Sequence, residues 1–304
     1  MRFSWSPRRF ETTRSAMSTF VAITVEDRSE ARAQEAIGRA FEEMERLAAL
    51  LTRFESGSPL GVLNATGRLA DPPPELSRVV ARGLLIHQAS AGAFDPTVAP
   101  LVDLFELHFA AHGGPPDEAE LRDVREIVGA GRLRLGGGGV HFERAGMALT
   151  LDGIAKGFIV DRIVDTVAAA GVRHALVNAG GDVRALGARA DGRPWRVAVQ
   201  DPLRPASHVE VVGLVDAAIA TSGDYVRFHD AERRYHHTVV PGTGRSPETI
   251  ASVSVRAPTA MEADALATAV FVLGDRAGGR LAEARGARCL VLTRAGERIA
   301  SPGW

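Results

Sequence analysis

The chain has 304 residues, with 45% hydrophobic and 24% charged side chains, which is ordinary for a globular protein of one large domain or two small ones. Its 36 basic and 37 acidic residues leave no overall field that would attract nucleic acid or an anionic membrane. The single cysteine, Cys289, excludes an internal disulfide framework and a thiolate metal cluster. No stretch approaches the roughly 18 apolar residues that a membrane-spanning helix requires.

The first 16 residues are predicted to form a disordered leader. Arg8 and Arg9 are reminiscent of a twin-arginine signal, but the residues that follow, Glu11 to Ser15, are polar rather than apolar. We therefore expect a cytoplasmic protein. Residues 17–304 are expected to form a single domain, with two intertwined sub-domains as the alternative arrangement.

The remaining chain alternates helical and strand-like patterns. Apolar side chains recur at helical spacing from Ala36 to Leu51, whereas Phe20 to Val25 is rich in β-branched residues. Further helices are predicted near 75–91, 117–128, 155–170, 259–273 and 276–284, and further strands at 149–151, 175–178, 196–200, 209–214, 217–220 and 235–240, with hairpin turns at 136–139 and 294–296. Because these elements lack a βαβ rhythm, we predict an α+β fold with mixed or antiparallel sheets.

The helix predicted after Pro258 carries a candidate metal site. Thr259 and Glu262 have the spacing of a capping box, which indicates where the helix begins. Asp264 and Thr268 are four residues apart, so a carboxylate and a hydroxyl lie on one face, as a hard cation such as Mg²⁺ requires. The structural alternative is that Thr268 bonds back to the helix and Asp264 complements its dipole. Spacing alone favours that alternative.

Two loops carry further candidates. Gly153-Ile-Ala-Lys-Gly157 joins a predicted strand to a helix, where backbone amides and Lys156 suit an anion. The alternative there is an ordinary turn with a solvated lysine, and Asp152 is either a ligand-facing acid or a helix cap. His236 and His237 lie in a predicted strand, so only one of them can face a shared cleft. The sequence contains no dinucleotide-binding glycine fingerprint and no phosphate-binding P-loop motif.

In their order along the chain these segments resemble the ApbE-type FAD:protein FMN transferases. The resemblance runs from about residue 17 to 293 and is carried by six blocks: Met17-Ser-Thr-Phe20, Ala93-Phe-Asp-Pro-Thr97, Gly153-Ile-Ala-Lys-Gly157, Val177-Asn-Ala-Gly-Gly-Asp182, Thr221-Ser-Gly-Asp-Tyr225 and the helix segment 257–268. It implies an ApbE-like fold with helices and sheets packed around a central FAD cleft.

The resemblance also implies a reaction. Mg²⁺ bridges the pyrophosphate of FAD, FMN passes to a Thr or Ser hydroxyl of an acceptor flavoprotein, and AMP leaves. The implied metal ligands are Asp264, Thr268 and the carbonyl of Gly153. His237 is the implied base for the acceptor hydroxyl, and Lys156 is the second catalytic candidate. The positions at which the family contacts FAD are Met17, Phe54, Ala93, Phe94, Asp95 and Lys156.

The sequence departs from the family pattern at two acids. Thr150 stands where the family has a flavin-contacting aspartate, and Val240 replaces an aspartate of the turn after His237. Whether Asp152 compensates stays open, and these three residues complete the FAD-binding candidates. Two alternative functions follow: a Mg²⁺-dependent FAD pyrophosphatase that releases FMN and AMP, and a non-catalytic FAD-binding protein. The expected partner is a membrane-associated redox subunit. The family also includes periplasmic relatives, whereas a cytoplasmic location is expected for this chain.

Overall fold

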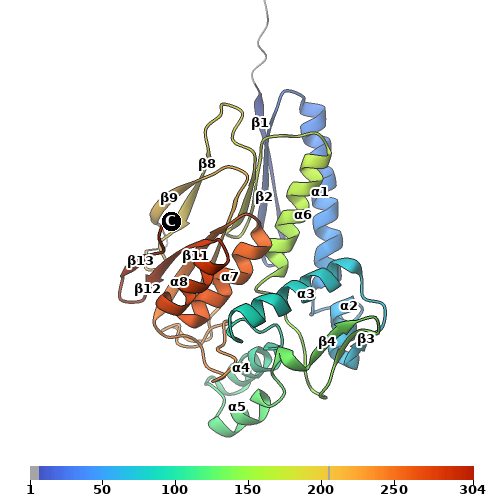
Figure 1. Ribbon diagram of the computed structural model, residues 1–304, viewed down its shortest axis with the longest axis vertical. Helices are drawn as coiled ribbons and strands as arrows, with labels where there is room; N and C mark the ends of the chain where they lie inside the picture. The colour runs from blue at the N-terminus through green and yellow to red at the C-terminus, as the bar shows by residue number, and fades with distance from the viewer. Residues whose placement is uncertain (1–6, 205) are drawn as a thin grey trace, which may run out of the picture.

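An eight-stranded antiparallel sheet forms the centre of the computed structural model, which describes residues 7–204 and 206–304 (Figure 1). Every pair of neighbouring strands in it is antiparallel. The strands lie in the order β1 (Arg8–Ala16), β2 (Thr19–Asp27), β6 (Ala175–Ala179), β7 (Asp182–Leu186), β10 (Ala218–Gly223), β11 (Ile250–Ala257), β12 (Arg288–Thr293) and β13 (Arg298–Ala300). The predicted α+β class is confirmed, because helices separate strands that nevertheless pair antiparallel.

Four helices cover one face of this sheet: α1 (Glu30–Leu51), α6 (Ala155–Ala169), α7 (Ala260–Leu273) and α8 (Asp275–Ala284) (Figure 1). In α1 the buried residues, among them Ile37, Phe41 and Met44, recur every three or four positions, so they form one apolar stripe facing the core. The side chain of Ser29 caps the start of that helix by accepting a hydrogen bond from the amide of Arg32.

The opposite face of the sheet carries a two-stranded hairpin, β8 (Trp195–Gln200) and β9 (His208–Leu214). Successive side chains of a strand point to opposite faces, and β7 shows this clearly. Val183 and Ala185 pack in a cluster with Trp195 of the hairpin. Asp182 and Arg184 instead form ion pairs with residues of α6 on the helical side. This alternation places two charged side chains of β7 beside the helices that carry the candidate site.

A smaller helical part packs below the main sheet in Figure 1 and completes the walls of the site. It holds α2 (Pro59–Thr66), α3 (Pro74–Ala89), α4 (Ala99–His112), α5 (Glu118–Arg125), a 3₁₀ turn (Ala130–Arg132) and a three-stranded sheet of β3 (Arg68–Leu69), β5 (Gly139–Phe142) and β4 (Leu133–Gly136). Its cluster of Leu101, Val102, Phe105 and Leu121 includes Val239 from the loop after β10. That contact holds the histidine-bearing loop against α4.

Three sequence predictions require correction. The leader proposed for residues 1–16 is wrong over Arg8–Ala16, which form β1 at the edge of the sheet; residues 1–6 lie outside the described residues. Residues 149–151 are not a strand, because the side-chain amide of Asn64 pairs with both backbone groups of Leu149. Residues 235–240 are not a strand either, since only His236 forms a single bridge, with Phe228.

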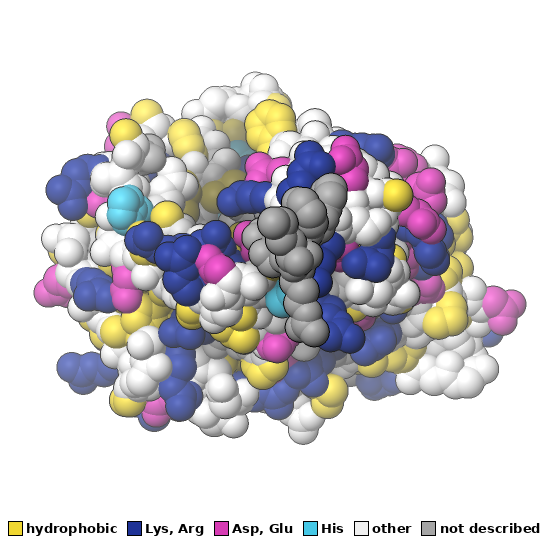
Figure 2. Space-filling view, turned by 90° about the horizontal axis from the view of Figure 1, so that it is seen from above, with side chains coloured by type: hydrophobic (Ala, Val, Ile, Leu, Met, Phe, Trp, Pro, Cys, Tyr) yellow, Lys and Arg dark blue, Asp and Glu magenta, His cyan; other side chains and the backbone are white. Residues whose placement is uncertain are grey.

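The surface of the described chain is mixed in charge. Figure 2 looks onto the end of the molecule above β1 and shows basic side chains spread among acidic ones. Exposed ion pairs of β1 with α1 include Arg8 with Glu30 and Arg14 with Glu45. No helix within residues 7–204 and 206–304 is both long and apolar enough to cross a membrane.

Candidate active site

A cleft of about 140 Å³ lies where the N-terminus of α6, the helix α7 and the end of β10 meet two loops. Its wall brings together ten of the residues singled out in the sequence: Ala93, Phe94, Asp95, Thr150, Asp152, Gly153, Lys156, His237, Asp264 and Thr268. These residues come from four separate parts of the chain. Their convergence therefore results from the tertiary fold rather than from local spacing.

The predicted metal ligands lie together at the base of this cleft. Asp264 and Thr268 are one turn apart on α7, and the hydroxyl of Ser222 lies 3.3 Å from that of Thr268. A side chain at Gly153 would bring its Cβ to 2.9 Å from the Thr268 hydroxyl, so the backbone of Gly153 closely approaches the same place. The donors are a carboxylate, hydroxyls and a carbonyl, which are the hard oxygens that Mg²⁺ prefers.

The donor set is sparse. Within the described ranges no three His, Cys, Asp or Glu side chains cluster in a way that could hold a metal ion by themselves. The described residues of this cleft therefore do not form a metal site made of protein side chains alone. Mg²⁺ is commonly held by one or two carboxylates together with phosphate oxygens of the substrate, and one Asp264 with neighbouring oxygens fits that arrangement. The residues present thus fit a magnesium ion that is shared with a phosphorylated substrate.

Lys156 is the only lysine in the sequence, whose other basic side chains besides histidine are all arginines. Its ammonium lies 3.5 Å from Asp182, a residue of β7 that is 1% exposed. Burial acts to lower the pKa of Lys156, but the charges of Asp182 and Asp264 outweigh it and raise that pKa. Lys156 is therefore a fixed positive charge in the cleft. Its ammonium is a compact point charge with three donors, so it can face both acids and still approach a phosphate.

Asp264 and Asp182 are buried acids close enough to influence each other's protonation. Burial raises the pKa of Asp264 well above its ordinary value, and the neighbouring charge of Asp182 raises it further. One oxygen of Asp264 accepts the amide of Gly157 at 3.0 Å, and one buried oxygen of Asp182 faces the Lys156 ammonium at 3.5 Å. A divalent cation beside Asp264 would reverse this balance by favouring the ionised form.

His237 lines the cleft with its ring held in one orientation. Its Nδ1 lies 3.1 Å from the carbonyl oxygen of Arg227, which can only accept, so Nδ1 carries the proton. Nε2 is therefore the unprotonated nitrogen and is available as a base. Burial lowers the pKa of His237, which keeps the ring neutral at pH 7. The adjacent His236 is 1% exposed, with its ring edge-on to Phe271, and it has a structural role.

The loop Ala93–Asp95 forms the opposite wall. Phe94 is buried at 4% exposure and faces the cleft near Gly153. One carboxylate oxygen of Asp95 accepts hydrogen bonds from both the amide and the hydroxyl of Thr97, and the other accepts from the amide of Ala130. The carboxylate of Asp95 therefore shapes its own loop. Beyond Asp95 a second cavity of about 510 Å³ adjoins the cleft.

Thr150 and Asp152 both line the cleft, although the sequence left open whether Asp152 could take the place of the missing acid. The segment is an irregular turn rather than a strand, and the Thr150 hydroxyl accepts the amide of Asp152 at 3.2 Å. Three other candidates are absent from the wall. Met17 lies in the β1–β2 turn against the core, Phe54 is 65% exposed beside Arg53, and Val240 bonds through its backbone to Arg245.

Sequence reasoning gave no role to two residues of the site, Asp182 and Ser222. Asp182 comes directly after a glycine pair at the start of β7, where a solvated acid is equally common, so only its place in the block 177–182 marked it. Ser222 follows Thr221 on β10, whose hydroxyl bonds Ser254 at 2.7 Å on the next strand. Because side chains alternate along a strand, one hydroxyl of that pair faces Ser254 and the other faces α7.

The cleft is small for a dinucleotide. Pockets for ligands of this size usually measure about 300–1,000 Å³. A cavity of about 140 Å³ can hold the pyrophosphate and its immediate neighbours, and the ends of the ligand would extend along the surface. The lysine, the hard oxygens and the amides at the start of α6 all lie at this narrow centre. The fit with FAD is therefore a fit with its diphosphate.

Solved structures with this fold define a class. The chain superimposes on the flavin transferase ApbE from Vibrio cholerae with a TM-score of 0.84 and 28% identity, covering 97% of this chain and 98% of that one. The ApbE protein from Thermotoga maritima gives a TM-score of 0.88 and 27% identity, with 97% of each chain covered. The fold is thus the flavin transferase fold, as the sequence resemblance implied.

The sequence comparisons identify the family. The ApbE family matches residues 17–291. The FAD:protein FMN transferase of Treponema pallidum is 35% identical over 269 residues, covering 81% of this chain and 74% of the relative. That of Vibrio cholerae is 35% identical over 212 residues, covering 68% of this chain and 63% of the relative. The chain belongs to the ApbE family, a family of transferases by the names of these relatives.

Proposed function

We propose that this protein transfers FMN from FAD to a Thr or Ser hydroxyl of an acceptor flavoprotein, with Mg²⁺ as the metal and AMP as the second product. The observation that carries the proposal is the convergence of Asp264, Thr268, Lys156 and His237 on one cleft, in a chain that belongs to the ApbE family. The acceptor oxygen forms a bond to the FMN-side phosphorus of FAD. The anhydride bond breaks, and the bridging oxygen leaves with AMP.

The chain's own residues supply positioning, charge and a base. Nε2 of His237 takes the proton that the acceptor hydroxyl loses, so the reaction releases no free alkoxide. Lys156 and the amides at the start of α6 hold the diphosphate in line with the incoming oxygen. Asp264, Thr268 and the carbonyl of Gly153 would hold Mg²⁺, which supplies charge neutralisation on the phosphate oxygens when bound. Cleaving a phosphoanhydride needs little more from a protein than this alignment and charge.

The proposal is tested by incubating the protein with FAD, Mg²⁺ and an acceptor flavoprotein. The expected result is a fluorescent acceptor band whose mass has grown by one FMN, with one AMP formed per adduct. The same assay without acceptor distinguishes the alternatives, because His237 could activate water in place of a hydroxyl. Release of free FMN and AMP without acceptor, at a comparable rate, would indicate that the protein hydrolyses FAD rather than transfers FMN. Tight FAD binding without any product would indicate a non-catalytic protein.

The partner and the cellular location remain predictions of the sequence. We propose a membrane-associated redox subunit as the acceptor and a cytoplasmic location for this chain. Co-expression with a flavin-dependent redox subunit, followed by mass analysis of that subunit, tests the acceptor. An adduct formed only in the periplasm would contradict the proposed location.

A further inference from the structure

Asp161, a buried acid of α6 that does not line the cleft, contacts the start of the helix that carries the metal ligands. Its carboxylate accepts the amide of Ala260 at 2.8 Å through one oxygen and the amide of Met261 at 2.9 Å through the other. The residue is 8% exposed. An acid of one helix therefore caps the N-terminus of a neighbouring helix, where negative charge is favoured by the helix dipole.

This contact completes the hydrogen bonding at the start of α7. The first four amides of a helix have no partner inside it. In α7 the amides of Ala260 and Met261 donate to Asp161, and that of Glu262 donates to the hydroxyl of Thr259. The amide of Ala263 makes the first regular bond of the helix, to the carbonyl of Thr259. Two of these three capped amides are thus held from outside the helix. The position of α7 along its own axis thus depends on Asp161.

The same face of α6 touches α7 a second time, one turn earlier. The amide of Gly157 donates to the Asp264 carboxylate, and a Cβ at Gly157 would lie 2.8 Å from the Cβ of Asp264 and still closer to the Ala260 carbonyl. Positions 157 and 161 are four apart and share a face. The two contacts therefore set the register between α6, which carries Lys156, and α7, which carries Asp264.

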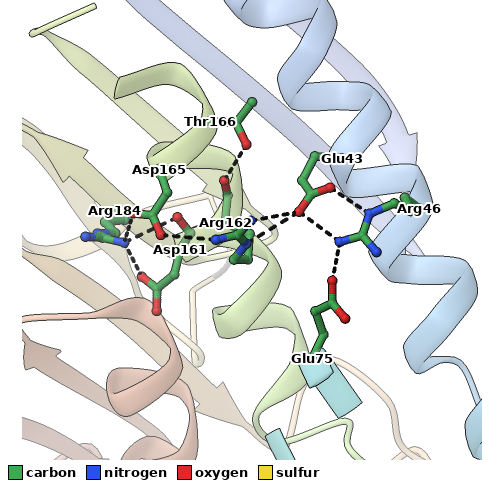
Figure 3. Close-up of polar contacts among 8 residues, drawn as sticks. All are labelled: Glu43, Arg46, Glu75, Asp161, Arg162, Asp165, Thr166 and Arg184. Carbon is green, nitrogen blue, oxygen red and sulfur yellow. Dashed lines mark hydrogen bonds and ion pairs between the residues drawn. The ribbon is translucent and has the colours of Figure 1, made fainter. Parts of the chain in front are cut away.

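Arg184 balances the buried charge of Asp161. Its guanidinium lies 3.0 Å from the Asp161 carboxylate and 3.4 Å from that of Asp165. Figure 3 draws both contacts. On its other flank α6 is tied to α1 through Arg162 and Glu43. Asp182 and Arg184 are two apart on β7, so they share a face: the first contacts Lys156 and the second contacts Asp161. α6 is thus fixed from both sides, and α7 is positioned against it.

We infer that Asp161 is a positioning residue for the reaction, which holds α7 so that Asp264 and Thr268 face Lys156 and the diphosphate. The inference rests on the proposed function for what the cleft binds, but the cap itself does not depend on it. Asp161 touches neither substrate nor metal in this scheme. Loss of the Asp161 carboxylate would let α7 shift or fray at its first turn, one turn before Asp264. Metal binding would weaken while the protein stays folded.

The test compares Asp161→Asn with Asp165→Asn. Both changes neutralise an acid on α6 that pairs with Arg184, but Asp165 is half exposed at its side chain and is not a partner of the α7 amides. In Asp161→Asn the side-chain NH₂ faces a backbone donor, so one amide of α7 loses its acceptor. The conservative Asp161→Glu keeps a carboxylate and is expected to give an intermediate result.

Two readouts that do not need turnover report on the cap. Because Lys156 is the only lysine, labelling with ¹⁵N-lysine gives one backbone amide signal, next to Gly157, whose shift follows Mg²⁺ titration in the presence of FAD. We expect Asp161→Asn to need at least tenfold more Mg²⁺ for half saturation than the parent or Asp165→Asn. Hydrogen exchange of the Ala260 and Met261 amides is expected to accelerate at least tenfold in Asp161→Asn alone.

The outcomes separate the cap from the function. Exchange and Mg²⁺ titration of Asp161→Asn at the level of Asp165→Asn would overturn the inference, as would a lower melting temperature with an unchanged titration. If Asp161→Asn is recovered unfolded, Asp161→Glu decides by the same two measurements. A parent protein that protects both amides but neither binds Mg²⁺ with FAD nor forms product would refute the proposed function while leaving the cap established.

Discussion

Replacing Asp264 by Asn tests the metal assignment with the least disturbance of the fold. The amide side chain of Asn has the same shape as that of Asp. It keeps an oxygen that can accept the hydrogen bond from the Gly157 amide, which lies 3.0 Å from the carboxylate in the parent. The change also removes one of two neighbouring buried acids, and burial already raises the pKa of both. We therefore expect the free energy of unfolding to change by no more than about 1 kcal/mol.

The effect on transfer is expected to be much larger. Asp264 is the only carboxylate among the proposed metal ligands, and a bound metal stabilises the transition state of such reactions by several kcal/mol. A loss of about 3–4 kcal/mol corresponds to a rate lowered by roughly 10²–10³-fold, since each 1.4 kcal/mol is about tenfold. Asp275→Asn, which removes an acid from the first turn of the next helix, is the matched control.

The assay is the initial rate of FMN adduct formation over a range of Mg²⁺ concentrations, with thermal unfolding of each variant measured alongside. Asp264→Asn should show a lowered rate that excess Mg²⁺ restores in part, whereas Asp275→Asn should match the parent. Parental rates in Asp264→Asn at low Mg²⁺ would refute the reasoning. So would an equal loss of rate in both variants, because that would reflect stability rather than metal binding.

Three further changes test other parts of the account. His237→Gln should lower the transfer rate by about 10²–10⁴-fold, and an unchanged rate in the variant would exclude His237 as the base. In the parent protein the rate should fall only at a pH below the ordinary histidine pKa of about 6.5, because burial lowers the pKa of His237. Gly157→Ala should lower the free energy of unfolding by about 1–3 kcal/mol and weaken Mg²⁺ binding, because the new Cβ collides with the carbonyl of Ala260. A variant that unfolds at the same temperature as the parent would contradict this expectation. Burial lowers the pKa of His236 to about 4, so the folded state resists protonation of this ring. Its contribution to the free energy of unfolding is present above about pH 6.5 and is lost as the pH falls toward 4, a loss on the order of 3 kcal/mol. A His236→Gln variant whose stability falls with acid as much as that of the parent, in denaturant titrations, would refute the assignment.

The helices and most strands could be predicted because their signals are local. The apolar stripe of α1 and the capping residue Thr259 of α7 mark their elements without help from the rest of the chain. β1 was missed because it is an edge strand. Of its nine residues only Phe10 is buried, so the polar, arginine-rich sequence resembles a solvated segment. Charged side chains on an edge strand are common, since they discourage pairing with another chain.

The two predicted strands that do not form have apolar, β-branched sequences whose backbone groups find other partners. Asn64 satisfies Leu149 through its side chain, and the hydroxyl of Ser246 accepts the amide of His236. These partners are 85 and 10 residues away in sequence, so a local pattern contains no sign of them.

The candidate site divides in the same way. Asp264 and Thr268 could be paired from helical spacing, but their meeting with Lys156 and His237 followed only from the family resemblance and is a result of the tertiary fold. Asp161 and Asp182 were not assigned because each acts across a gap between elements. An acid in the middle of a helix and an acid after a turn are both common on solvated surfaces. Only burial and the partners at the other end of the contact distinguish them.

The most direct test of the account is a crystal structure with FAD and Mn²⁺ in place of Mg²⁺, in which the ion is located by anomalous scattering. The account predicts a peak about 2.0–2.3 Å from a carboxylate oxygen of Asp264, with the diphosphate of FAD on its other side and Lys156 beside the phosphates. A peak elsewhere, or a diphosphate bound away from the first turns of α7, would contradict it.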